Sequence, residues 1–418
     1  MSFERIGIRP ARILLPAPSV PRETWACIAC DQYTSEPEYW QKAFACAVDA
    51  PSALRLILPE VYLKQSESMI SGIHDAMARY LREGLLVPSV DPGFILCERT
   101  VPAGRRLGLV CAVDLEQYSF EKGSLPLVRP TEQTIASRLP PRLVIRRGAP
   151  VELTHIMILI DDPDRTVLEP LQAKEKDLRK LYDFDLMMNG GHLAGWAVDR
   201  PEDLQHVDGA LNRLLDSLGA DPLLLAVGDG NHSLATAKAY WNELRENLSE
   251  KERETHPARF ALCEIVNIHD EALLFEPIHR VVTGTSADAL LSDWQTYAAA
   301  RGMVLAEDGE GHPFTVVSAG GDRTVVVRQP EGAIPCETIQ KFLDDFLARH
   351  PEAEIDYIHG EQSLRTLASA PGAVGFLLPE IDKHSFFADV RRLGVLPRKT
   401  FSMGEADEKR FYMEAKEI

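Results

Sequence analysis

The segment Leu223–Trp241 limits the possible folds of this chain more than any other part of it. It joins an apolar run, Leu223–Val227, to a helix-forming run through the sequence Gly228-Asp-Gly-Asn-His-Ser233. This order predicts a buried strand, a tight turn and the start of a helix. Gly228 and Gly230 allow backbone conformations that other residues avoid, and the first amides of a helix have no carbonyl partner within it. The turn therefore suits an anion, especially phosphate.

The side chains of the turn add chemistry to this backbone. Asp229 supplies a carboxylate that can hold a cation or take a proton, while Asn231, His232 and Ser233 place donors at the mouth of the helix. These residues indicate a nucleotide or another phosphorylated ligand. The same spacing also fits a simpler structure in which Asp229 or Asn231 only caps the helix.

At 418 residues the chain is longer than one hydrophobic core usually supports. Strand-like and helix-like patterns alternate along it, which predicts a mixed α/β (α+β) fold. Changes of pattern divide the chain into an N-terminal α/β region at 1–125, a core with the Gly-Asp-Gly-Asn-His turn at 126–282 and a C-terminal α/β region at 283–418. We also expect a hairpin from Phe94–Thr100 and Arg106–Asp114, a buried strand at Leu153–Ile160 and a helix at Thr131–Leu139.

Charge limits the partners of the protein. A net charge of −18 argues against binding to nucleic acid or to an anionic membrane, because both need a clustered basic surface. Small-molecule partners are expected instead, and the basic group Arg142, Arg146 and Arg147 is suited to attracting an anionic substrate. The sequence leaves the oligomeric state open, with a homodimer among the possibilities.

The cellular compartment is predicted from what the sequence lacks. The N-terminus has no apolar core of a signal peptide, and no stretch is long enough to span a bilayer, so we expect a cytoplasmic protein. Seven cysteines in such a chain are expected to be reduced thiols. Cys27 and Cys30 have the spacing of a zinc or redox pair, but no second pair follows, which favours ordinary half-buried thiols.

Two N-terminal polar clusters supply candidate substrate-binding residues. In the first, Asp31 can orient a substrate or metal and Tyr33 can stack on a base. A polar N-cap before a helix at Glu38 explains the same residue types equally well. In the second, Thr131 is placed to cap a helix, with Glu132 and Thr134 in its first turn. If this segment faces the Gly-Asp-Gly turn, Glu132 is a candidate general base that activates a hydroxyl, and Thr134 a substrate ligand.

A further cluster, Phe275–Arg280, ends a strand-like stretch with a His-Arg pair. Arg280 can clamp a phosphate or carboxylate through two parallel hydrogen bonds, with His279 beside it as a substrate ligand. Spacings typical of zinc proteases, serine hydrolases and phosphate-loop nucleotide triphosphatases are missing from the sequence, so these classes lose support.

Several of these segments, in order, resemble the domain-of-unknown-function 1015 family of bacteria and archaea, and the match runs from end to end. It rests on Trp25–Trp40, Leu56–Leu63, Arg129–Ile135, Gly228–Ala237, Glu276–Arg280 and Leu396–Phe401. The middle third also resembles the ParB/sulfiredoxin-like fold, which includes free-serine kinases with an Asp-Gly-His-x-Arg-like motif. Here the motif reads Asp229-Gly-Asn-His-Ser233, so a serine stands where an arginine is usual, and Arg280 or Lys238 are candidates to supply the missing cation.

The resemblance implies a nucleotide-binding core and a kinase-like phosphotransferase that uses ATP or ADP with Mg²⁺ on a small hydroxyl-bearing metabolite. In this hypothesis Glu132, Asp229 and His232 are catalytic, Asp229 also holds the metal, and Arg280 clamps phosphate or substrate. The nucleotide phosphates lie against Gly228, Gly230, Asn231 and Ser233. Two alternatives explain the same turn, namely a non-catalytic nucleotide- or metabolite-binding regulator and a phosphate-ester hydrolase.

Overall fold

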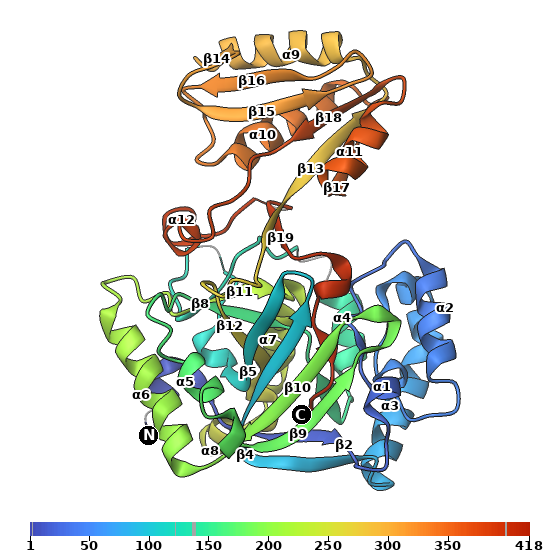
Figure 1. Ribbon diagram of the computed structural model, residues 1–418, viewed down its shortest axis with the longest axis vertical. Coiled ribbons are helices and arrows are strands. Elements are labelled where there is room, and N and C mark those ends of the chain that lie inside the picture. The colour runs from blue at the N-terminus through green and yellow to red at the C-terminus, as the bar shows by residue number, and fades with distance from the viewer. Residues whose placement is uncertain (2, 122, 136–138, 398) are drawn as a thin grey trace. The chain divides into compact units, whose positions relative to one another are not determined.

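The computed structural model describes residues 1, 3–121, 123–135, 139–397 and 399–418 (Figure 1). The chain forms two compact units, one made of Met1–Leu274 with Ala406–Ile418 and the other of Phe275–Glu405. In sequence, the second unit is thus inserted into the first, and the chain rejoins the first unit at Ala406. Helices and strands alternate throughout, which confirms the mixed α+β class.

A 12-stranded sheet forms the centre of the first unit in the described part of the chain. Its main path, from edge to edge, is β6 (Val128–Pro130), β11 (Leu225–Asp229), β8 (Met157–Ile160), β12 (Phe260–Asn267), β5 (Gly104–Asp114), β4 (Leu86–Val101), β2 (Ala11–Pro16), β21 (Ala415–Glu417) and β7 (Val151–Leu153). Beside this path, β1 (Ile8–Arg9) pairs with β5, β10 (His192–Val198) with β4, and β9 (Arg179–Asp185) with β10. Strands from the predicted regions 1–125 and 126–282 therefore share one sheet.

The predicted hairpin is confirmed as β4 and β5, which pair antiparallel around a turn at Pro102 and Ala103. Both faces of this hairpin are buried, and alternate residues face different cores. Ile95 and Val110 belong to one apolar cluster, whereas Leu96 and Leu109 belong to another. Covering both faces explains why these strands read as continuous apolar runs instead of an alternating pattern.

Helices of the first unit cover this sheet. They are α1 (Arg22–Trp25), α2 (Pro37–Cys46), α3 (Ser66–Arg82), α4 (Leu139–Arg146), α5 (Glu169–Gln172), α6 (Pro201–Ser217), α7 (Asn231–Arg245) and α8 (Glu250–Thr255). The helix expected at Thr131–Leu139 is wrong over its first part, because residues 131–135 are not helical; residues 136–138 lie outside the described part of the chain. Helix α4 has Pro140 and Pro141 in its first turn, where the missing N–H of proline costs no hydrogen bond within the helix.

The strand expected at Leu153–Ile160 is broken in the structure. It divides into β7 and β8 at Thr154–Ile156, where the Thr154 hydroxyl accepts a hydrogen bond from the Ile156 amide at 3.1 Å. A local hydroxyl–backbone bond of this kind competes with strand pairing. The break leaves His155 outside both strands.

The C-terminal residues complete the first unit. Strand β20 (Phe411–Tyr412) pairs with β3 (Cys27–Ile28) in a separate two-stranded sheet, and β21 lies between β2 and β7 in the large sheet. Phe411, Tyr412 and Met413 are all buried. This return brings the segment around residues 407–413 to the segment around residues 27–31.

The second unit has its own sheet and its own core. Its path is β14 (Val304–Ala306), β16 (Arg323–Arg328), β15 (His312–Val317), β18 (Ala373–Leu377), β13 (Phe275–Thr283) and β17 (Glu354–His359), with β19 (Phe401–Met403) also on β13. Its helices are α9 (Ala287–Ala299), α10 (Pro335–Arg349), α11 (Glu361–Ala368) and α12 (Phe386–Leu393). Trp294, Phe342 and Phe376 are buried at the centre of its core. The predicted boundary at 282/283 lies within β13.

Among the residues that the structure describes, no helix combines the length and the apolar character needed to cross a membrane.

Candidate functional site

The predicted strand, turn and helix are confirmed as β11 and α7. Gly230 joins them with a φ of +77°, a left-handed conformation that favours glycine. A Cβ atom at this position would also lie 3.0 Å from the Ile156 Cα atom. Gly228 has a different role, because it lies inside β11 where the register with β8 shifts between Val227 and Asp229. Gly230 thus allows the turn, and Gly228 lies at the irregularity in strand β11.

The polar side chains of the turn do not cap α7. The Asp229 carboxylate accepts a hydrogen bond from the Gly230 amide at 2.9 Å and lies 3.4 Å from Lys409 Nζ. Asn231 instead bonds Thr131, whose amide donates to Asn231 Oδ1 at 3.1 Å. Within the described part of the chain, α7 has no side-chain capping hydrogen bond at its N-cap residue, Gly230. The first amides of α7 therefore point out of the helix without a carbonyl of their own helix to bond.

The segment that contains Glu132 is held against this turn. Strand β6 runs parallel to β11, and the Thr131 hydroxyl donates to the Val227 carbonyl at 2.5 Å. Four residues later, the Ile135 amide donates to His232 Nε2 at 3.4 Å. Glu132 lies between these two contacts and is half-buried, as is Thr134. The sequence makes Glu132 a candidate base if its segment meets the turn. The contacts of Thr131 and Ile135 fulfil this condition.

The His155 side chain makes a second set of contacts beside the turn. Its Nε2 atom lies 3.1 Å from Ser233 Oγ and 3.6 Å from Asp31 Oδ2, and its Nδ1 atom lies 2.6 Å from the Tyr412 hydroxyl. Because an ionised carboxylate only accepts hydrogen bonds, Asp31 favours a hydrogen on Nε2. The imidazole then directs this N–H toward Ser233 and Asp31, and the Tyr412 hydroxyl donates to Cys30 Sγ at 3.1 Å.

The electrostatics of this cluster keep Asp31 ionised. Burial alone would raise the pKa of Asp31, but the charge of His155, a hydrogen bond from Gln32 and the charge of Lys409 together lower it. Lys409 therefore acts on both Asp31 and Asp229. Burial has the opposite effect on the neighbouring thiol, because it raises the pKa of Cys30 to about 12, with the Asp31 charge adding to it. Cys30 is a protonated thiol at neutral pH.

A cavity of about 150 Å³ in the first unit opens onto this cluster. His155, Ser233, Cys30 and Tyr412 line one part of it. Arg142, one of the three arginines that the sequence singled out, also lines it and pairs with Glu60. Arg146 lines it too, whereas Arg147 forms an exposed pair with Glu243.

Three other predicted residues have partners of their own in the structure. Tyr33 stacks on Tyr39, with ring centroids 3.8 Å apart. Arg280 belongs to the second unit, where its exposed fraction is 0% and its guanidinium contacts the carbonyls of Ile278 and Lys399 and the Cys336 sulfur. His279, also there, accepts a hydrogen bond from the Leu378 amide, and burial lowers its pKa.

A fourth residue, Lys238, had been a candidate to supply the cation missing at Ser233. It donates instead to the Leu115 carbonyl at 2.8 Å, and burial lowers its pKa. At the turn itself, Lys409 supplies a cation, 3.4 Å from Asp229.

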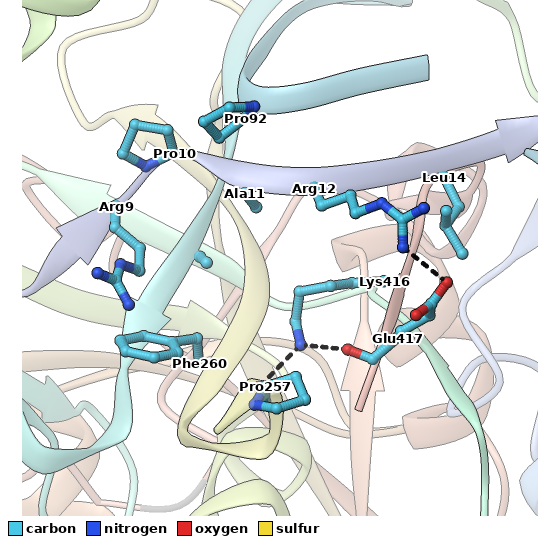
Figure 2. Close-up of a pocket in the computed structure, with 11 residues that line it drawn as sticks. Arg9, Pro10, Ala11, Arg12, Leu14, Pro92, Pro257, Phe260, Lys416 and Glu417 are labelled. Atoms are coloured by element: carbon cyan, nitrogen blue, oxygen red, sulfur yellow. Dashed lines mark hydrogen bonds and ion pairs between the residues drawn. The ribbon is translucent and has the colours of Figure 1, made fainter. Parts of the chain in front are cut away.

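A separate pocket of about 460 Å³ lies between β2, β12 and the C-terminal strand of the first unit (Figure 2). It contains none of the predicted site residues, and its cations are already engaged. Arg9 lies over the Phe260 ring at 4.1 Å, and Arg12 pairs with Glu417 at 3.1 Å. Lys416 donates to the Pro257 carbonyl at 2.9 Å. We therefore place the candidate site at the α7 turn.

Sequence reasoning missed three members of this site, His155, Lys409 and Tyr412. His155 was read as part of a continuous strand, and only the Thr154 side chain at the break signals otherwise. Lys409 and Tyr412 reach the site because β20 pairs with β3 across almost the whole chain. No local pattern predicts such a pairing.

Magnesium was expected at Asp229. Among the described residues, no three His, Cys, Asp or Glu side chains gather to hold a metal ion by themselves. This arrangement still fits Mg²⁺, because this ion is typically bound by one or two carboxylates together with substrate phosphates. Asp229 is the carboxylate at the turn that suits this role.

The chain matches one family model, and parts of it resemble several solved structures. A family model described as "Protein of unknown function (DUF1015)" matches residues 8–346. No curated protein matches the chain. Among solved structures, a free serine kinase mutant in complex with AMP is 12% identical, with a TM-score of 0.41, over 73% of this chain and 90% of that one.

Two further structures show similar agreement. SbnI from Staphylococcus aureus, truncated at its C-terminus, is 8% identical with a TM-score of 0.38, over 71% of this chain and 82% of that one. A conserved hypothetical protein from Pyrococcus furiosus is 12% identical with a TM-score of 0.37, over 79% of this chain and 97% of that one.

Proposed function

We propose that this chain, which belongs to the DUF1015 family of proteins of unknown function, is a nucleotide-dependent phosphotransferase that acts on a small hydroxyl-bearing metabolite. The observation that carries the proposal is the position of Lys409. Its ammonium lies 3.4 Å from Asp229 at the N-terminus of α7 and also acts on Asp31 beside His155. A cation, a helix N-terminus and two carboxylates thus share one site.

The phosphate side of the proposed site is the α7 turn. Its outward amides and Lys409 supply the positive charge that a phosphoryl group needs, since phosphoryl transfer depends mainly on positioning and charge neutralisation. Asn231 is held in place by Thr131, and the left-handed backbone of Gly230 forms the turn at which α7 begins. Bound Mg²⁺ would neutralise phosphate charge, with Asp229 as its protein ligand.

The acceptor side is the network of Asp31, His155 and Ser233. His155, whose Nε2 atom lies 3.6 Å from Asp31, donates its Nε2 hydrogen to the oxygen of the acceptor hydroxyl, which leaves the hydroxyl's own hydrogen directed to the base. Glu132, in the segment held against the turn, is the proposed base. The hydroxyl oxygen forms the new bond to phosphorus, the bond to the leaving nucleotide breaks, and the hydroxyl proton passes to Glu132.

Phosphorus NMR of the protein with ATP or ADP, Mg²⁺ and a panel of hydroxyl-bearing metabolites tests this proposal. The account predicts a phosphorylated acceptor, and the variant Glu132→Gln is expected to slow its formation roughly a hundredfold or more. The matched control is Glu121→Gln, which makes the same change at an exposed loop residue of the same unit. A fully active Glu132→Gln variant would remove Glu132 from the mechanism. Release of inorganic phosphate without any acceptor would indicate a hydrolase instead.

A further inference from the structure

Cys336 and Arg280 form a candidate reactive centre in the second unit. We infer that Cys336 is a thiolate nucleophile, held by the Arg280 guanidinium, and that it reacts with a small electrophile without negative charge in the adjoining pocket. Both residues belong to the unit Phe275–Glu405, whereas the α7 turn belongs to the first unit. The inference therefore goes beyond the proposed function and does not depend on it.

The first argument is the buried charge of Arg280. Its side chain is fully buried, and a guanidinium stays protonated in proteins. In the described part of the chain no carboxylate forms an ion pair with it. Besides Cys336, the guanidinium contacts the carbonyls of Ile278 and Lys399, the side-chain oxygen of Gln340 at 3.4 Å and the ring of Tyr357 at 5.3 Å. None of these four groups carries a full negative charge, and an uncompensated buried charge is costly.

The sulfur of Cys336 is placed to supply the missing charge. Arg280 Nη2 lies 3.0 Å from Cys336 Sγ and donates a hydrogen bond to it. A protonated thiol leaves this buried pair with one positive charge, whereas a thiolate makes the pair neutral. Burial without such a partner has the opposite effect, as at Cys111, where it raises the pKa of the thiol. The contact with Arg280 therefore favours the ionised form of Cys336.

The start of helix α10 adds to this effect. Cys336 is the second residue of α10, and the positive end of a helix dipole favours an anion in the first turn. Glu337 is an acid in the same turn, but Lys341 pairs with it at 3.0 Å. The Thr400 hydroxyl lies 3.3 Å from Cys336 Sγ and also bonds a carbonyl. Because its hydrogen can turn to the sulfur, this contact does not require a hydrogen on Sγ.

A pocket of about 160 Å³ gives small molecules access to Cys336. This volume is many times the roughly 15 Å³ that one water molecule needs by the same measure. The lining includes the carboxylates of Glu380, Asp382 and Asp389, of which Asp389 pairs with Arg392 at 2.6 Å. No lysine, arginine or histidine is among the described residues that line the pocket. Carboxylates repel anions, so the pocket favours an electrophile without negative charge.

Iodoacetamide is a probe of the expected reaction. The sulfur of Cys336 forms a bond to the carbon that carries iodine, the carbon–iodine bond breaks, and iodide leaves with the electron pair. No base has to remove a proton, because the sulfur is already ionised. The rate at Cys336 is therefore expected to be almost independent of pH near neutrality.

Pulse alkylation of the full chain at pH 6 and pH 8, followed by mass spectrometry, tests this expectation. An ordinary thiol with a pKa of about 8.5 gains thiolate roughly seventyfold over this range, and the exposed Cys46 provides the comparison. We expect the alkylation rate at Cys336 to change less than threefold. A rate that rises as steeply as that of Cys46, or a Cys336 that stays unmodified while Cys46 reacts, would overturn the inference.

A variant tests the role of Arg280. Arg280→Gln keeps hydrogen-bond donors but removes the charge, and it is expected to give Cys336 the steep pH dependence of an ordinary thiol. Arg328→Gln makes the same change in an exposed pair with Asp308 of the same unit and should leave the flat profile intact. A flat profile in a folded Arg280→Gln protein would show that Arg280 does not hold the thiolate. If the variant does not fold, the wild-type profile still decides.

Iodoacetate, the anionic counterpart of iodoacetamide, tests the class of electrophile. The ratio of the two alkylation rates at Cys46 gives the difference between the reagents at an exposed thiol. Relative to this ratio, we expect iodoacetate to react at least fivefold more slowly at Cys336, because Glu380 and Asp382 line the pocket. Equal ratios at the two cysteines would contradict selection against negative charge.

Discussion

At the scale of single residues, the site depends on charges that are partly removed from water. Asp31 retains its charge because His155, Gln32 and Lys409 together outweigh the effect of burial on its pKa. Cys30, one residue away, has no such compensation, and its pKa rises to about 12. Neighbouring acids in one cluster are thus held in opposite protonation states, and each state can be measured.

The lowered pKa of Asp31 predicts how stability depends on pH. A carboxyl whose pKa is lower in the folded than in the unfolded protein stabilises the fold above its unfolded value of about 4, and this contribution is lost as the pH falls through the folded value. We therefore expect Asp31→Asn to lower the free energy of unfolding at pH 7, with a difference from wild type that shrinks below about pH 4. Urea unfolding from pH 7 to 3 measures this difference. A difference that grows toward low pH would show that the sign is wrong.

The raised pKa of Cys30 predicts slow alkylation. With a pKa of about 12, roughly one thiol in ten thousand is ionised at pH 8, and the thiolate is the reactive form. Cys46 is exposed and provides an internal control. Mass spectrometry after iodoacetamide treatment is expected to show Cys46 modified long before Cys30. Similar rates for both would mean that Cys30 is ionised at the site.

At the scale of elements, the turn between β11 and α7 depends on Gly230. Its φ of +77° and the 3.0 Å approach of Ile156 both exclude a larger residue. We expect Gly230→Ala to destabilise the first unit by about 1 to 3 kcal/mol and to weaken nucleotide binding, because it moves the start of α7. Gly72→Ala is the control, since a Cβ there meets no atom within 4 Å and alanine favours the surrounding helix α3. Thermal melting of both variants checks this; equal stability would contradict the turn geometry.

The elements also show how far sequence reasoning reaches. The hairpin β4–β5 and the β11–α7 unit were predicted because each is specified by residues next to one another in the chain. The helix expected at Thr131–Leu139 was wrong over residues 131–135, because the polar start resembles a cap whereas Thr131 bonds to Asn231 and to the β11 backbone. His155 was missed because the break between β7 and β8 depends on one hydroxyl bond from Thr154.

At the scale of the whole molecule, the two units have separate cores. The sequence placed a boundary near residue 283, in the first strand of the second unit, but it contained no signal that residues 406–418 return to the first unit. That return depends on buried contacts of Phe411 and Met413 with residues hundreds of positions earlier. The same long-range pairing places Lys409 at the site. Sequence reasoning therefore missed Lys409 and the return of residues 406–418 for the same reason.

Separate cores predict separate responses to mutation. Phe342 is fully buried in the core of the second unit, and Phe342→Ala is expected to cost about 3 to 5 kcal/mol. Hydrogen exchange should then accelerate within Phe275–Glu405 and remain unchanged in β11 and α7. Met413→Ala, which opens a cavity in the first unit, is the reciprocal variant and should spare the second unit. Acceleration of exchange in both units by either variant would show that they unfold as one.

The central claim is that nucleotide phosphates bind at the α7 turn beside Lys409, and calorimetric titration of the full chain with ATP and Mg²⁺ tests it most directly. We expect binding that weakens about tenfold or more in Lys409→Met, as removal of one charge-assisted contact costs about 1.5 to 3 kcal/mol. The control is Lys180→Met, which breaks an exposed lysine–aspartate pair with Asp183 in the same unit and should bind like wild type. Binding that is unchanged in a folded Lys409→Met protein, or absent from the wild type at millimolar ATP and ADP, would contradict the account.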